Sequence, residues 1–401
     1  MRNKKILVVS NLYYPYIIGG AEIVCQNLSE GLSALGYDIT ILTTNNGRFT
    51  SCESVNGLKV IRLKNCNFYF QKQEERPSWL MRRLWHILDI YNPFVKKEVA
   101  RIVNRIKPDI VICHNLAGFS ISILDCLNSF DIPIIEVLHD QYFLCPKSIS
   151  FKDGKICETQ CLECRLMRLP HRKKSSVVDV VVGVSKFVLK RLVDRGYFKN
   201  SQQYVIHNAQ NINVFPKREA WSGQRTLKVG YIGGLAEAKG VSLLINAFMS
   251  LTINAELLIA GVGNKEYEMF LKTLASEDKR IKFLGYMKPV DFYCQIDVCV
   301  LPSICADTFP GVAYESCAYG IPVIASRIGG IPEIIKNNRN GLLVESGSAE
   351  DLKAAISELY NYPEKLLELS KNARSEVEEM IDEKNWILKY DVLIQKVLQR
   401  K

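Results

Sequence analysis

Two acidic residues, Asp307 and Glu315, stand eight residues apart around the expected start of a helix. The segment follows an apolar run and a Pro302-Ser303 turn, and the helix is expected to begin at Gly311-Val312. A helix start offers free backbone N–H groups and the positive end of the helix dipole, both of which suit phosphate oxygens. Glu315, one turn further on, can accept hydrogen bonds from two ribose hydroxyls. Such an acid pair is common by chance, but its place between a Pro-Ser turn and a glycine-started helix is rarer.

Three other sites carry polar or glycine residues where strands are expected to end. Gly19-Gly20 precedes an expected helix, where two glycines let a phosphate approach the backbone or simply form a turn. His139-Asp140 follows a strand, so the imidazole points into a cleft or hydrogen-bonds a loop. Lys239 precedes another helix, where its ammonium can neutralise a diphosphate leaving group or remain an ordinary surface lysine.

Four of the 13 cysteines lie within 20 residues, with the spacing Cys-x11-Cys-x3-Cys-x2-Cys. Four thiolates so placed suit a tetrahedral structural zinc ion, which would pin the loop beside His139. An iron–sulfur cluster and four unrelated cysteines are the alternatives. The candidate metal ligands are Cys145, Cys157, Cys161 and Cys164.

These residues are connected by apolar runs that alternate with amphipathic stretches, a pattern that predicts parallel sheets with helices on both faces. We expect an N-terminal Rossmann-like domain over 1–215, with the cysteine insertion at 145–164, and a linker over 216–225. A second such domain follows over 226–380, and a helix over 381–401 is expected to pack back on the first domain. Chemistry in two doubly wound domains belongs at a cleft facing the carboxyl ends of their strands. The expected strands are 6–9, 39–42, 110–113, 132–138, 178–184, 204–206, 228–232, 257–260, 282–284, 298–301, 322–325 and 342–344.

The net charge of +10 is compatible with phosphorylated substrates or an anionic membrane surface. No nucleic-acid-binding module is recognisable, so nucleic acid is not an expected partner. The chain shows neither a membrane-spanning apolar run nor a signal-peptide core, and we expect a cytoplasmic protein. Residues 77–105 mix basic and aromatic side chains, which fits a helix at an anionic membrane interface as well as it fits ordinary packing.

The order of these motifs resembles glycosyltransferase family 4, whose members have the GT-B fold of two facing Rossmann-like domains and retain the anomeric configuration. The resemblance spans nearly the whole chain and is most specific from Pro302 to Val344. Some bacterial members carry a similar cysteine insertion. The motifs that carry the resemblance are Gly19-Gly20, His139-Asp140, Val184-Ser185, Ile206-His207-Asn208-Ala209, Lys239-Gly240, Asp307 with Glu315, and Gly329-Gly330-Ile331-Pro332-Glu333.

The resemblance implies a role for each matching residue. Gly19 and Gly20 line the donor phosphate site, and Gly311 and Val312 bind phosphate within a donor-binding stretch that includes Phe309. His139 lies beside the reacting sugar, while Asp307 touches that sugar. Lys239 holds the diphosphate and Glu315 binds the ribose. The expected catalytic residues are His139, Lys239 and Asp307.

Two positions depart from the family pattern. Asp307 replaces the usual Glu and is one methylene shorter, and Gly234 stands where the family usually has an Arg that pairs with the lysine on the diphosphate. Arg327 is a candidate to supply the missing cation.

The resemblance implies transfer of a sugar from a UDP- or GDP-linked donor to a glycan or lipid-linked acceptor, in surface polysaccharide or glycolipid assembly, with no catalytic cofactor. The alternatives are a nucleotide-sugar epimerase, a phosphorylase and a non-catalytic nucleotide-sugar-binding protein.

Overall fold

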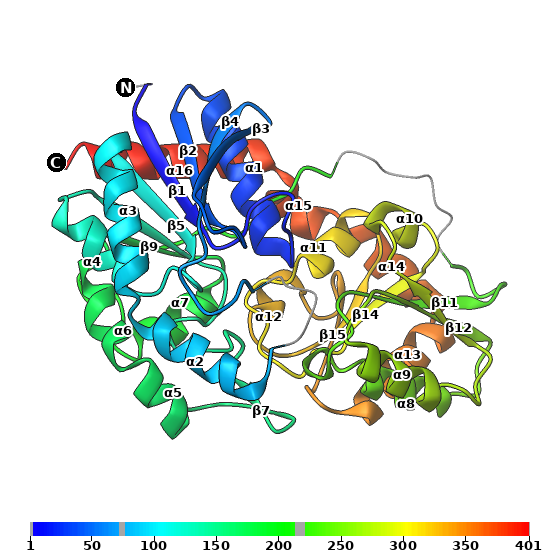
Figure 1. The fold of residues 1–401 in the computed structure, drawn as a ribbon. Coiled ribbons are helices and arrows are strands. Elements are labelled where there is room, and N and C mark those ends of the chain that lie inside the picture. Colours follow the sequence, from blue (N-terminus) through cyan, green and yellow to red (C-terminus); the bar gives the residue numbers. More distant parts are fainter. Residues whose placement is uncertain (1–2, 72–76, 213–220, 401) are drawn as a thin grey trace. The chain divides into compact units, whose positions relative to one another are not determined.

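The computed structural model describes residues 3–71, 77–212 and 221–400. The chain forms two compact units. The first unit contains Met1–Ser150, Glu158–Gln210 and Glu383–Lys401, and the second contains Phe151–Cys157 and Asn211–Asp382. Each unit is built on a largely parallel sheet with helices around it (Figure 1).

In the described part of the chain, the first unit has an eight-stranded sheet in the order β10-β9-β6-β5-β1-β2-β4-β3. Neighbouring strands run parallel, except that β3 and β4 are antiparallel. The strands are β1 (Lys5–Ser10), β2 (Asp38–Thr44), β3 (Ser51–Val55), β4 (Leu58–Leu63), β5 (Ile110–Asn115), β6 (Ile134–Leu138), β9 (Val180–Gly183) and β10 (Gln202–Val205).

Helices surround this sheet, and the last of them comes from the end of the chain. The helix α16 packs on α1 so closely that a Cβ at Gly31 would lie 2.2 Å from Ile387 Cδ1. The Tyr37 hydroxyl also donates a hydrogen bond to Asp391 on α16. The helices of the first unit are α1 (Gly20–Ala34), α2 (Trp79–Ile90), α3 (Pro93–Ile106), α4 (Ser122–Ser129), α5 (Leu162–Met167), α6 (Leu169–Lys174), the 3-10 turn η1 (Ser175–Val177), α7 (Lys186–Val193) and α16 (Glu383–Leu398).

The second unit has a parallel sheet in the order β13-β12-β11-β14-β15-β16. The strands are β11 (Leu227–Ile232), β12 (Ala255–Ala260), β13 (Ile281–Gly285), β14 (Val298–Leu301), β15 (Val323–Ser326) and β16 (Gly341–Val344), and a separate hairpin joins β7 (Phe151–Lys152) to β8 (Lys155–Ile156). The helices are η2 (Glu237–Lys239), α8 (Val241–Met249), α9 (Lys265–Leu274), α10 (Pro289–Tyr293), α11 (Gly311–Ala318), α12 (Ile331–Ile334), α13 (Ala349–Asn361), α14 (Pro363–Ala373), η3 (Ser375–Val377) and α15 (Glu378–Ile381).

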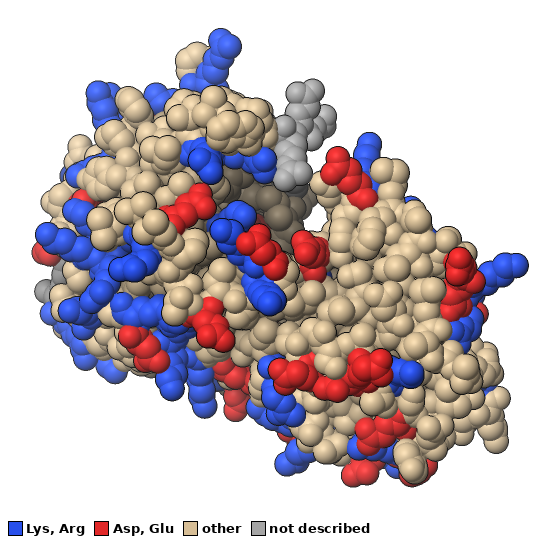
Figure 2. Space-filling view, turned by 90° about the horizontal axis from the view of Figure 1, so that it is seen from below, with Lys and Arg blue, Asp and Glu red and all other residues tan. Residues whose placement is uncertain are grey.

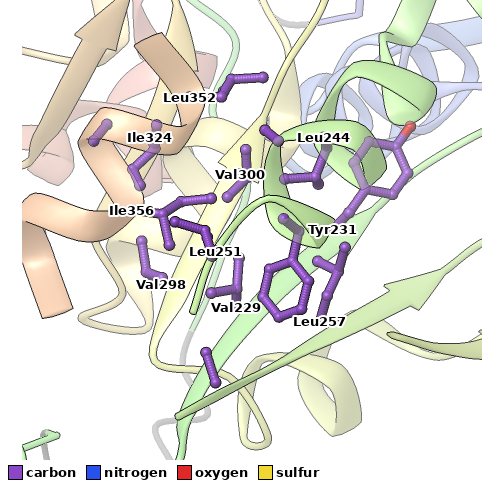
Figure 3. Packing of buried hydrophobic residues seen from close by; sticks show 14 of the residues in the cluster. Val229, Tyr231, Leu244, Leu251, Leu257, Val298, Val300, Ile324, Leu352 and Ile356 are labelled. Atoms are coloured by element: carbon purple, nitrogen blue, oxygen red, sulfur yellow. The ribbon is translucent and has the colours of Figure 1, made fainter. Parts of the chain in front are cut away.

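The apolar patterns explain these sheets. The strand β1 reads Lys-Ile-Leu-Val-Val-Ser and is buried from Ile6 onward, as expected of a central parallel strand covered on both faces. In the second unit, β11, β12 and β14 supply Val229, Leu257 and Val298 to a core that α8 and α13 cover (Figure 3). In each sheet the strand order reverses beside the first strand of the unit, β1 or β11, where ligands bind α/β sheets.

The sequence pattern predicted most strands correctly, and the differences have local causes. The strand expected from residue 132 begins at Ile134, because Pro133 has no N–H to donate to a sheet. The hairpin of β3 and β4 was missed, although its Asn56-Gly57 turn, at φ 50° and 80°, is a strong hairpin signal. Residues 77–105 form two helices, because Asn92 caps α3 ahead of Pro93.

Residues 216–220 of the predicted linker lie outside the described residues. Trp221, the first described residue of the predicted linker, is buried in the core of the second unit, and its indole N–H donates to the Arg225 carbonyl at 2.6 Å. No helix among the described residues has the length and apolar character needed to cross a bilayer.

Candidate active site

In the second unit, the loop after β11 and the loop after β14 are locked together. The backbone N–H groups of Ile304 and Cys305 both donate to the Ala238 carbonyl, at 2.9 and 3.0 Å. Gly240 has a φ of 70°, and a Cβ there would lie 2.0 Å from the Pro302 carbonyl oxygen. Only glycine fits this position, so the close approach fixes the preceding Lys239 against the loop that carries Asp307.

Lys239 and Asp307 form an ion pair at this junction. The Lys239 ammonium donates to Asp307 Oδ1, and the Ser303 hydroxyl donates to Asp307 Oδ2 at 2.7 Å. Burial tends to lower the pKa of Lys239, but the Asp307 carboxylate outweighs it and holds the pKa above its ordinary value. Lys239 is therefore a fixed positive charge, and its side chain remains 34% exposed.

A turn at Gly329-Gly330 packs against the backbone of Asp307. Gly329 has a φ of 62°, and a Cβ there would lie 2.2 Å from the Asp307 carbonyl oxygen. The N–H of Gly330 donates to the same oxygen at 2.8 Å. The Gly329-Gly330 motif thus holds the backbone that carries the acid.

The helix α11 begins at Gly311, as predicted, and its N-cap residue, Pro310, makes no side-chain hydrogen bond to the first turn. Gly311 and Val312 are half-buried, so this helix start is open to an anion from one side. Phe309 is buried instead, with its ring packed against Tyr314 at a centroid distance of 5.8 Å. Phe309 therefore shapes the loop by packing.

Glu315 folds back toward the start of α11, where its Oε1 would lie 3.0 Å from a Cβ at Gly311. The hydroxyl of Tyr293 lies 3.4 Å from Glu315 Oε2 and from the Val312 carbonyl oxygen. Burial raises the pKa of Glu315 to about 7, against the lowering effect of Tyr293. This carboxyl group is thus half ionised near neutral pH.

Gly234, which stands where the family usually has an Arg, lies in open space. No atom comes within 4 Å of a Cβ placed there, and its carbonyl accepts a hydrogen bond from the Tyr231 hydroxyl at 2.8 Å. Burial, followed by the charge of Asp307, raises the pKa of Tyr231, which places this tyrosine near the acid. The guanidinium of Arg327 lies 3.4 Å from the Leu343 carbonyl oxygen.

In the first unit, Gly19 is the N-cap residue of α1 and Gly20 is its first residue, so the helix after β1 begins one residue before the expected start at Ala21. Gly19 precedes the helix in an extended conformation, and its N–H donates to Glu22 Oε2 at 2.8 Å. A Cβ at Gly20 would meet no atom within 4 Å. Packing within the unit therefore does not demand glycine at position 20, which leaves room for a ligand to approach the backbone.

His139 directly follows β6 in the sheet of the first unit, and its ring lies against that of His114. His114 Nδ1 and His139 Nε2 lie 2.8 Å apart, and the two rings stack with centroids at 5.1 Å. Burial lowers the pKa of His139 to about 4 and, together with His139, lowers that of His114. Both imidazoles are therefore neutral near pH 7, so they can exchange hydrogen bonds without carrying charge.

Asp140 shapes the turn after His139. Its carboxylate accepts hydrogen bonds from the Tyr142 N–H at 2.7 Å and the Asn115 side chain at 3.3 Å. Burial raises the pKa of Asp140 to about 6. The acid thus joins the ends of β5 and β6.

The cysteine segment brings its thiols into contact pairwise. Cys164 hydrogen-bonds Cys145, which lowers the pKa of Cys145 and raises that of Cys164. Cys161 also hydrogen-bonds Cys164, and it is the N-cap residue of α5. Even so, the described residues include no group of three or more His, Cys, Asp or Glu side chains placed to hold a metal ion. The predicted zinc site, which also includes Cys157, remains a prediction.

Three residues of these sites were missed by sequence reasoning. His114 follows the predicted strand 110–113 directly, so its place at the same sheet edge as His139 was a usable signal. Ser303 had been noted only as part of a turn. Tyr293 lies on the short helix α10, and no local pattern connects it to Glu315.

Two family models match the chain, one over each half. The model described as Glycosyltransferase Family 4 matches residues 18–213, and the model described as Glycosyl transferases group 1 matches residues 217–376. An uncharacterized 42.6 kDa protein in the cps region of Klebsiella pneumoniae is 31% identical over 329 residues, which cover 82% of this chain and 87% of that relative.

Solved structures share the fold over nearly the full length. Sucrose-phosphate synthase from Thermosynechococcus elongatus matches with a TM-score of 0.80 and 20% identity, with both chains covered completely. Anabaena HepE in complex with UDP and glucose matches with a TM-score of 0.73 and 16% identity, covering 98% of this chain and 100% of that chain.

Two Rossmann-like units with parallel sheets, together with these matches, define the GT-B class of glycosyltransferases. The chain belongs to the glycosyltransferases that the family 4 and group 1 models describe, the first model matching its N-terminal part and the second its C-terminal part. It is therefore a glycosyltransferase. The resemblance identified from its motifs is thereby confirmed.

Proposed function

We propose that the protein transfers a sugar from a nucleoside-diphosphate donor, linked to UDP or GDP, to an acceptor hydroxyl with retention of the anomeric configuration. The observation that carries the proposal is the junction of the loops after β11 and β14. There a charged Lys239 lies against Asp307, four residues before the open start of α11. A cation and a helix N-terminus side by side suit the two phosphates of a leaving diphosphate.

In the proposed reaction the bond from the anomeric carbon to the diphosphate oxygen breaks, and the acceptor oxygen forms a bond on the same face. The Lys239 ammonium and the N–H groups of Gly311 and Val312 stabilise the charge that develops on the diphosphate. The departing phosphate takes the acceptor proton. The chemistry that this chain supplies is mainly electrostatic stabilisation of the leaving group.

The remaining residues position the donor. Glu315, when ionised, accepts hydrogen bonds from the ribose hydroxyls, and Asp307 contacts the transferred sugar. Gly19 and Gly20 leave room for the donor phosphates, and the neutral His139 offers a hydrogen bond to the reacting sugar. His114 is a positioning residue, because it acts through the ring of His139.

The acceptor is proposed to be a glycan or a lipid-linked glycan, at the cytoplasmic side of a membrane, in the assembly of a surface polysaccharide or glycolipid. The Klebsiella relative is named for the cps region, which supports that setting. Structural relatives crystallised with UDP and UDP-glucose support a nucleotide-sugar donor.

Lys239 provides the direct test. Lys239→Ala should reduce turnover about a hundredfold, the cost typical of removing one stabilising group from a developing anion. Lys282→Ala is the matched control, since Lys282 also forms an ion pair in the second unit but lies on β13 with Glu256. Release of UDP or GDP from a panel of donors measures turnover, and NMR of the product gives its anomeric configuration. Equal activity of the Lys239 and Lys282 variants would refute the role of Lys239, and an inverted product would refute retention.

A further inference from the structure

Three leucines form an outward-facing stripe on the cysteine segment and the helix after it. Leu162 and Leu166 lie on α5 and Leu169 begins α6, at spacings of four and three residues. Leu162 and Leu166 therefore share a side of α5, and apolar residues at that spacing usually face a protein core. Arg168, at φ −110° and ψ 12°, interrupts the helix before Leu169. Here each of the three has a relative exposure between 63% and 74%. The structure thus exposes an apolar face where the sequence pattern predicts a buried one.

The helix α2 packs against α5 and has an exposed apolar face of its own (Figure 1). Its buried side carries Trp85 and Asp89. Trp79, Leu80 and Ile87 have relative exposures between 52% and 63%. The two helices that carry these exposed apolar side chains, α2 and α5, thus pack against each other within the first unit.

Basic side chains lie on the same helices as these exposed apolar residues. Arg83 stacks over the Trp79 ring at 5.4 Å, and Arg165, Arg172 and Lys173 are exposed along α5 and α6. Glu163 is the acidic residue in the same stretch of α5. Figure 2, which views the molecule from the side where α2 and α5 lie in Figure 1, shows Lys and Arg side chains gathered on the first unit.

We propose that the outer faces of α2, α5 and α6 bind the surface of an anionic lipid bilayer. The leucines and Trp79 enter the boundary between headgroups and acyl chains, and the Arg and Lys side chains contact the lipid phosphates. Charge complementarity favours this occupant, because exposed apolar side chains edged by cations match an anionic interface. The inference rests on the proposed function for its purpose, which is to hold the enzyme where a lipid-linked acceptor lies.

Vesicle binding tests the surface without donor or acceptor. The full-length protein is sedimented with vesicles of phosphatidylcholine alone and of phosphatidylcholine with about one-third phosphatidylglycerol. We expect clear binding to the anionic vesicles and little to the neutral ones. The double variant Leu166→Glu, Leu169→Glu should weaken binding by at least about tenfold per leucine, and Arg172→Gln with Lys173→Gln by about fivefold per charge.

The control is a pair of exposed apolar residues elsewhere in the first unit. Leu388→Glu with Val392→Glu changes α16 in the same chemical way and should leave vesicle binding unchanged. The inference is overturned if the wild-type protein does not bind anionic vesicles, or if the Leu166→Glu, Leu169→Glu variant binds them as well as the Leu388→Glu, Val392→Glu control. It is also overturned if the protein is a dimer that the leucine variant converts to a monomer, because the face would then join two copies.

Binding of UDP and GDP, measured by calorimetry on the same variants, separates this inference from the proposed function. The leucine variant should keep its melting temperature and its nucleotide affinity. Nucleotide binding without vesicle binding would overturn the membrane surface alone. Vesicle binding without binding of either nucleotide would support the surface and count against the proposed donor site.

Discussion

If Glu315 binds the ribose of the donor as proposed, its raised pKa should make nucleotide affinity depend on pH. In the free protein this pKa is about 7, chiefly because the carboxyl group is buried. Because ribose hydroxyls donate to a carboxylate, the proposed contact predicts that the donor binds the ionised form of Glu315 and lowers its pKa in the complex. With the pKa of the free protein, the Glu315 carboxyl group is ionised in about nine-tenths of the molecules at pH 8 and in about one-tenth at pH 6. Affinity should therefore fall about tenfold as the pH drops from 8 to 6.

The terminal phosphate of the nucleotide has a pKa of about 6, so its protonation also weakens binding in acid. Glu315→Gln separates the two effects, because it keeps the phosphate and removes the carboxyl group. Glu256→Gln, on β12, is a control for the loss of an acidic residue in the same unit.

Titration calorimetry with UDP and GDP, repeated at pH 6, 7 and 8, measures the affinities. Two buffers of different ionisation enthalpy give the number of protons released. Near pH 7 the wild-type protein should release about half a proton more than Glu315→Gln. If the two proteins show the same pH profile and the same proton release, Glu315 does not bind the ribose as an anion and the reasoning fails.

Three further predictions concern backbone, charge and metal. Gly240→Ala should lower the free energy of unfolding by about 3 kcal/mol, because strain at positive φ adds to a clash with Pro302. Gly285→Ala, where φ is 67° and no atom lies within 4 Å, should cost only about 1 kcal/mol by urea denaturation; equal costs would contradict the close approach. Gly234→Arg should tighten binding of the diphosphate by roughly fivefold to tenfold in calorimetry while leaving the melting temperature unchanged, and a weaker complex would contradict the open space seen there. Elemental analysis should find about one zinc ion per chain that Cys145→Ser loses, and metal-free wild-type protein would end the zinc hypothesis.

The sequence predicted the fold well because parallel strands buried on both faces are continuous apolar runs. It also predicted the glycine-started helix at Gly311 and the place of Lys239 before α8, since these depend on neighbours along the chain. The partners that fix the side chains come from distant segments. Tyr293 reaches Glu315 across 22 residues, and Lys239 reaches Asp307 across 68. No local pattern could have shown these pairs.

The exposed leucines Leu162, Leu166 and Leu169 show a second limit of prediction from the sequence. Periodicity predicts which residues share a side of a helix, but it does not predict whether that side is covered. Coverage depends on which elements pack nearby, and here α5 packs against α2 while Arg168 and His171 are the buried residues of the segment.

The interleaved assignment of segments to the two units has a practical consequence for dissecting the enzyme. The chain changes unit after Ser150, Cys157, Gln210 and Asp382, so no single cut releases either half intact. A fragment ending at Gln210 would lose the C-terminal helix that fills the surface above Gly31, leaving the apolar side of α1 bare. Such a truncation is expected to aggregate when expressed, whereas a fragment that rejoins residues 383–401 through a short Gly/Ser tether should stay monomeric.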